Sequence, residues 1–117
     1  MAIKTDATHF SNTDEQTEVS VRQLLQQLES QHPPFLLDVR QPEELQNDPA
    51  ITAAVNIPLG QLMAHLAEVP KDKPVVIVCH SGSRSLLAQK FLTGKGYDCK
   101  SLAGGMVAWN YTQHALP

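Results

Sequence analysis

Short runs of apolar residues alternate along this chain with segments in which apolar residues recur at helical spacing. The clearest run extends from Pro74 to Cys79, and it is uninterrupted and rich in β-branched side chains. A second continuous run extends from Phe35 to Val39. Such runs are typical of strands that are buried on both faces of a parallel sheet. The expected strands lie at Val19 and in the ranges 35–39, 54–56, 74–79 and 97–102.

The segments between these runs predict helices. Ser20 is a residue type that caps helices, and it precedes an apolar-periodic segment that stops at two prolines, residues 33–34. Pro42 is followed by two glutamates, a pattern that suits the first turn of a helix. The further helical segments expected are an apolar-periodic stretch over 59–66, a helix capped by Ser83 or Ser85 that ends at Gly94, and a terminal helix starting with Met106.

Strands and helices therefore alternate throughout, which predicts an α/β domain built around a parallel sheet. The length of 117 residues suits a single domain. Residues 1–16 are polar and show no sustained period, so we expect them to form a flexible N-terminal arm. Residues 17–117 are then expected to form the folded domain.

Composition and charge narrow the possible partners and location. The net charge is −3 and the basic residues are scattered, which argues against a nucleic-acid partner or an acidic membrane surface. The opening residues contain no secretory signal, and no apolar run is long enough to span a bilayer. The two cysteines are far apart in sequence and do not suggest a disulfide framework. We therefore expect a cytoplasmic protein.

The residues that follow Cys79 carry the candidate chemistry. Cys79 ends the strongest predicted strand, and the loop 80–85 leads from it into a helix. Ligands bind at this edge of open α/β sheets, and a loop that enters a helix gathers backbone N–H groups around an anion. A thiolate held there is stabilised, so we expect Cys79 to be a nucleophile near neutral pH. Gly82 permits a tight turn, and the position of Arg84 at a helix start indicates an anionic ligand.

Four blocks of the sequence, in order, resemble the rhodanese family. Residues 79–85, Cys-His-Ser-Gly-Ser-Arg-Ser, are similar to its C-x-x-G-x-R-S loop. Asp38-Val39-Arg40 with Glu44-Leu45 resembles its D-V-R…E-F segment, residues 56–59 resemble N-I-P-L, and residues 102–109 resemble L-x-G-G-x-x-A-W. The match covers about Glu18 to Trp109. It departs at 49–55, where the family often has G-H-I-x-G-A.

The resemblance implies a three-layer fold, with a mostly parallel sheet between helices, and an enzyme similar to thiosulfate sulfurtransferase. Cys79 would take sulfane sulfur from a donor such as thiosulfate, become a persulfide and pass the sulfur to cyanide, a thiol or a partner protein, without a cofactor. The substrate-binding residues would be the remainder of the loop: His80, Ser81, Gly82, Ser83, Arg84 and Ser85. His80 stands where Arg or Tyr is frequent in the family, which favours a protein persulfide or a polysulfide over thiosulfate as donor.

Other residues have simpler interpretations. We expect Asp38 and Arg40 to be structural, tying the loop after their strand to Glu44 or to neighbouring backbone. Cys99 is expected to be a buried apolar residue. The remaining histidines show no metal-ligand spacing, so we expect no metal site.

Three alternative functions remain. A Cys-dependent phosphatase uses C-x5-R, whereas Arg84 here gives C-x4-R and Ser85 stands at the C-x5-R position. A non-catalytic rhodanese-like sulfur-carrier or interaction module is the second, although such modules commonly lose the cysteine. The third is a redox-sensing protein that uses Cys79 and Cys99, and its only support in the sequence is the number of cysteines.

Overall fold

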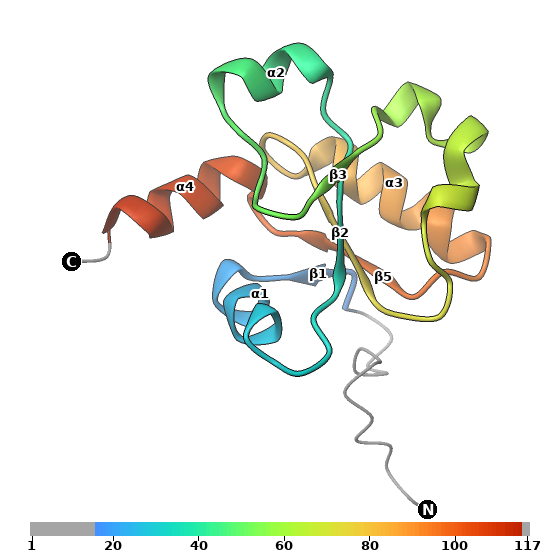
Figure 1. Cartoon of the computed structure of the whole chain (residues 1–117), viewed down its shortest axis with the longest axis horizontal. Helices are drawn as coiled ribbons and strands as arrows, with labels where there is room; N and C mark the ends of the chain where they lie inside the picture. The colour runs from blue at the N-terminus through green and yellow to red at the C-terminus, as the bar shows by residue number, and fades with distance from the viewer. Residues whose placement is uncertain (1–15, 116–117) are drawn as a thin grey trace, which may run out of the picture.

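The fold is a five-stranded parallel sheet between two helical layers (Figure 1). A computed structural model describes residues 16–115. The strand order is β1-β5-β4-β2-β3, and every neighbouring pair is parallel. The strands are β1 (Glu18–Val19), β2 (Phe35–Asp38), β3 (Val55–Asn56), β4 (Val75–Val78) and β5 (Cys99–Leu102). The predicted parallel sheet is confirmed, with the strongest predicted strand at its centre.

The central strand contributes to both cores, because successive side chains of a strand point to opposite faces. Val75 and Ile77 pack under α3 (Ser83–Gly94), whereas Val76 and Val78 pack against α1 (Val21–Leu28) and α4 (Gly105–Ala115). All four side chains are at most 1% exposed. Burial on both faces explains why this strand is a continuous apolar run. It also confirms the three-layer arrangement.

The starts of two helices agree with the sequence-based predictions, and the start of a third differs from its prediction. Ser20 caps α1, since its Oγ accepts a hydrogen bond from the amide of Gln23 and the Gln23 side chain accepts one from the amide of Ser20. The helix α2 (Pro42–Asn47) begins with its proline. The predicted serine cap of α3 is wrong: Gly82 occupies the cap position with a φ of +112°, a conformation that glycine adopts readily.

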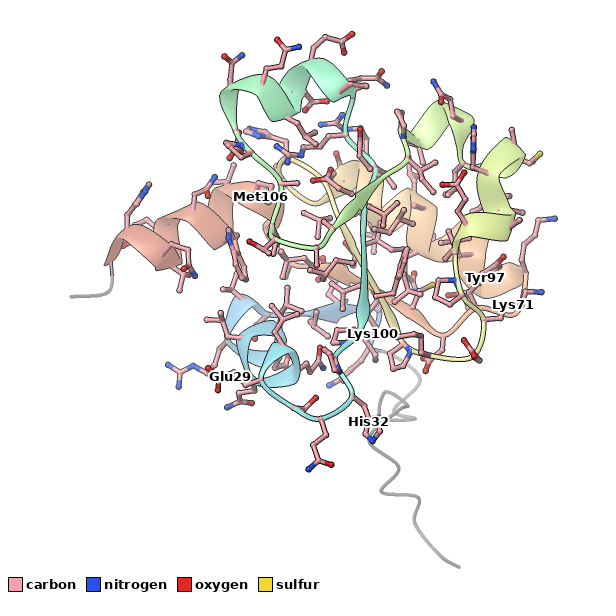
Figure 2. All side chains as sticks on the ribbon, viewed as in Figure 1. Glu29, His32, Lys71, Tyr97, Lys100 and Met106 are labelled. Carbon is pink, nitrogen blue, oxygen red and sulfur yellow. The ribbon has the colours of Figure 1, made fainter. Side chains whose placement is uncertain are left out.

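The segment after β3 forms two short 3-10 helices, η1 (Leu59–Gln61) and η2 (Met63–Glu68), instead of one regular helix. They extend the layer that contains α3, where Leu62 is buried. Tyr97 precedes β5 and joins this layer, because its hydroxyl donates to the carbonyl of Leu66 at 3.2 Å. Figure 2 shows Lys71 beside Tyr97, with the ammonium 5.1 Å from the ring centroid.

The carboxyl ends of β2 and β4 lead to the same edge of the sheet, because the strands are parallel. In Figure 1, α2, the loop between β4 and α3, and the start of α4 gather at this edge. Within residues 16–115, no helix combines the length and the apolar composition needed to cross a bilayer. The arm predicted for residues 1–16 lies outside the described residues, apart from Gln16.

Candidate active site

Cys79 follows the last residue of β4, and two backbone amides are directed at its sulfur. The N–H groups of Gly82 and Ser85 donate to Sγ at 3.1 and 3.3 Å. Both amides belong to the cap and first turn of α3. The N–H groups at this end of a helix have no acceptor within the helix, and the helix dipole there favours negative charge. Cys79 is 1% exposed. The loop therefore forms a buried cradle of hydrogen-bond donors around the sulfur.

A hydroxyl group completes the surroundings of the sulfur. Ser85 Oγ lies 3.3 Å from Cys79 Sγ and 3.2 Å from the carbonyl oxygen of Gly82. It also lies 2.7 Å from the hydroxyl of Ser101 in β5. Sequence reasoning missed Ser101. The signal that could have identified it is a hydroxyl in a buried strand, since a buried polar group needs a hydrogen-bond partner.

The start of α4 holds the outer side of the loop. The amide of Met106 donates to the carbonyl of Cys79 at 2.8 Å, and the amide of Val107 donates to that of His80 at 3.0 Å. Figure 2 shows Met106 at the beginning of α4, next to the end of the sheet. A Cβ atom added to Gly105 would lie 2.6 Å from the oxygen of His80 and would also overlap the oxygen of Cys79. The turn at Gly105, called the glycine turn below, thus allows the close approach of helix and loop.

Arg84 is directed at Glu44 of α2. Its two terminal nitrogens donate to the two carboxylate oxygens of Glu44 at 2.6 and 2.9 Å. These hydrogen bonds lower the pKa of Glu44 from 4.5 to about 2, although partial burial opposes the shift. The same carboxylate raises the pKa of Arg84. The sequence predicted that Arg84 meets an anionic ligand; in the structure the anion that it meets is a side chain of the protein.

Asp38 and Arg40 form a buried ion pair beneath the site. Their side chains are each 1% exposed, and Arg40 donates to Asp38 through Nε and Nη2 at 2.8 to 3.1 Å. Burial alone would lower the pKa of Arg40, but the hydrogen bonds to Asp38 and the negative charges of Asp38, Asp48 and Glu44 together outweigh burial and raise it. Arg40 Nη1 also donates to the backbone oxygen of Asp48 at 3.0 Å. Arg40 therefore ties its loop to Asp48 through the neighbouring backbone, and Glu44, the other partner considered, pairs with Arg84.

The remaining loop residues are at the surface. His80, Ser81 and Ser83 are exposed, and among the described residues no side-chain hydrogen bond joins them to Cys79. Of the predicted site residues, the structure thus brings Gly82 and Ser85 to the sulfur. It leaves three at the rim and directs Arg84 to α2.

Cys99 occupies a different part of the sheet. It is 6% exposed, and burial raises the pKa of its thiol. In the sheet register Cys99 lies opposite Val75, four residues before Cys79, which corresponds to about 13 Å along the strand. A disulfide requires Cα atoms within about 7 Å. The two cysteines are therefore not placed to form a redox pair.

Comparison with known proteins agrees with this geometry. Residues 20–112 match the family model of the rhodanese-like domain. A sulfurtransferase from Allochromatium vinosum is 36% identical over 101 residues, covering 86% of this chain and 92% of the relative. The putative sulfurtransferase YtwF from Bacillus subtilis is 35% identical over 92 residues, covering 79% of this chain and 88% of the relative.

A solved structure supports the same assignment. A rhodanese-like domain protein from Staphylococcus aureus superimposes with a TM-score of 0.75 at 30% identity, covering 80% of this chain and 90% of that protein. The family match extends over the four sequence blocks and the loop that surrounds Cys79. This chain belongs to the rhodanese-like domain family.

Proposed function

We propose that this protein is a sulfurtransferase that carries sulfane sulfur as a persulfide on Cys79. The observation that carries the proposal is the pair of amides, from Gly82 and Ser85, that donate to a sulfur buried at a helix N-terminus. Such a site stabilises a sulfur anion without needing a general base. Sulfur transfer in general is supported by the relatives named sulfurtransferases.

The reaction proceeds in two balanced steps. In the first, the Cys79 thiolate attacks the outer sulfur of a donor, the new S–S bond forms, and the electron pair of the broken bond leaves with the donor. With thiosulfate the leaving group is sulfite. In the second step, a thiolate or cyanide attacks the outer sulfur of the persulfide, and the Cys79 thiolate is regenerated as the leaving group. No net oxidation of the protein occurs.

The charges around the loop favour a persulfide of a thiol, carried by a protein or a small molecule, over thiosulfate as the donor. Thiosulfate is a dianion, and its binding would benefit from an unpaired cation. The guanidinium of Arg84 is held by two hydrogen bonds to Glu44, so its charge is neutralised within the protein. His80 is exposed at the rim and can contact a larger donor that covers the loop.

Paired turnover assays test the proposal. We expect the wild type to transfer sulfur to cyanide from both donors, with a lower KM for a small-molecule thiol persulfide than for thiosulfate. Cys79→Ser should abolish both activities, whereas the matched control Cys99→Ser should retain them. Hydrolysis of an aryl phosphate through Cys79, without sulfur transfer from either donor, would overturn the proposal in favour of a phosphatase.

A further inference from the structure

We infer that Ser101 is a positioning residue that holds the hydroxyl of Ser85 so that it can donate to the Cys79 thiolate. The inference rests on the proposed function in one respect: it assumes that the thiolate of Cys79 is the form that reacts. It adds a residue of β5 to a site otherwise built from the loop and α3.

The sheet places Ser101 beside the site. Ser101 lies opposite Ile77 of β4, and Cys79 follows two residues later on the same face of that strand. Ser101 shares its own face of β5 with Cys99, which packs in the core under α3. Ser85, from the first turn of α3, meets it there, and both serines are 0% exposed. Bulk water therefore cannot substitute for either hydroxyl.

Counting protons fixes the direction of the bond between the two serines. Ser85 Oγ is the one side-chain partner that the described residues offer to the hydroxyl of Ser101. A buried hydroxyl proton that is left unbonded is costly, so Ser101 donates and Ser85 accepts. The single proton of Ser85 is then available for one of two acceptors, the Gly82 carbonyl at 3.2 Å or Cys79 Sγ at 3.3 Å.

In the thiol state every donor has an acceptor. The Cys79 S–H donates to Ser85 Oγ, and Ser101 donates to the same oxygen. Ser85 gives its own proton to the carbonyl of Gly82. Ser85 Oγ therefore accepts two hydrogen bonds while the thiol is protonated.

In the thiolate state the hydroxyl of Ser85 turns to Sγ and becomes a third donor beside the two amides. The carbonyl of Gly82 loses that proton but keeps the amide of Leu86, which donates to it at 3.1 Å. Ser85 Oγ now accepts from Ser101 alone. Removing the Ser101 hydroxyl therefore destabilises the thiolate state more than the thiol state. Only in the thiolate state does the removal leave Ser85 Oγ with no hydrogen-bond donor.

The charged and titratable groups near Cys79 do not change in this comparison. They are Arg84 of α3 with its partner Glu44 of α2, the buried pair of Asp38 and Arg40 at the end of β2, and the adjacent His80. Serine-to-alanine variants at 85 and 101 leave all of them in place. A difference in the reactivity of Cys79 between these variants therefore reports on the hydroxyl groups.

The test is the rate at which iodoacetamide alkylates Cys79 as a function of pH, measured by intact mass in a Cys99→Ser background. We expect Ser85→Ala to raise the midpoint of the rate profile by about one pH unit and Ser101→Ala to raise it by about half a unit. The double variant should match Ser85→Ala, because Ser101 acts through Ser85. Unfolding in urea, measured in parallel, identifies any variant that is not folded.

The inference is overturned if Ser101→Ala leaves the midpoint unchanged, or if the two shifts add in the double variant. Alkylation does not require sulfur transfer, so the proposed function is tested separately. An intact midpoint shift in a protein that accepts no sulfur would sustain the role of Ser101 and refute the sulfurtransferase proposal. The opposite result would refute only the role of Ser101.

Discussion

The close approach between α4 and the Cys79 loop leads to a quantitative expectation for Gly105→Ala. The backbone of Gly105 has a φ of +56°, which costs an alanine about 1 kcal/mol. The added Cβ would lie 2.6 Å from the oxygen of His80, so α4 must move away from the loop. The movement breaks the hydrogen bonds from Met106 and Val107, each worth about 1 kcal/mol. The expected loss in the free energy of unfolding is about 3 kcal/mol.

Urea unfolding followed by the fluorescence of Trp109, the single tryptophan of the chain, measures this loss. Gly94→Ala is the matched control, because a Cβ at that helical position meets nothing within 4 Å. The control should change stability by less than about 1 kcal/mol and in the stabilising direction. Under conditions where Gly105→Ala is still folded, sulfur transfer should fall sharply, since the carbonyls of the loop are displaced. Equal stability of the two variants would refute the role assigned to the glycine turn.

Two further expectations concern the loop. The folded-state pKa of Glu44, about 2, lies below its ordinary value of 4.5, so the stability that Glu44 contributes is complete above pH 4.5 and is lost as the pH falls toward 2. Both side chains are about one third exposed, so we expect Glu44→Gln to lower the free energy of unfolding by about 1 kcal/mol at pH 7 and to weaken its dependence on acid pH. Urea unfolding at several pH values measures this. If the ion pair contributed nothing, the variant and the wild type would show the same dependence of stability on pH. Inserting an alanine between Ser83 and Arg84 displaces the amide and hydroxyl of Ser85 from the sulfur. Sulfur transfer should then fall at least about 100-fold in the turnover assay. Undiminished transfer would contradict the role given to the donors around Cys79.

The layers of the fold could be predicted from the sequence because the signal is local. Each residue of β4 is buried on one face or the other, so the strand is a continuous apolar run that needs no knowledge of its neighbours. The same holds for the start of α1, since a serine cap directly before an apolar-periodic segment is a local signal. The position of Cys79 could also be predicted, because a cysteine directly after a buried strand and before a glycine-containing loop lies at the carboxyl edge of a parallel sheet.

The partners across the site could not be predicted in the same way. Glu44 and Arg84 are 40 residues apart, and charge alone does not specify which carboxylate a guanidinium meets. Ser85 and Ser101 are 16 residues apart and meet because β5 is next to β4 under α3. The cap of α3 was predicted from residue preference, whereas the turn around Cys79 requires the positive φ of Gly82. In each case the three-dimensional path of the chain decides the contact.

The central claim is that Cys79 carries the sulfur, and intact-mass measurement tests it most directly. After incubation with a sulfane donor, the wild type and Cys99→Ser should each gain the mass of one sulfur atom, located by peptide mapping at Cys79 and removed by cyanide. Cys79→Ser should gain none. A wild-type protein that gains no sulfur from thiosulfate or from a thiol persulfide, or that carries the sulfur on Cys99, would contradict the account.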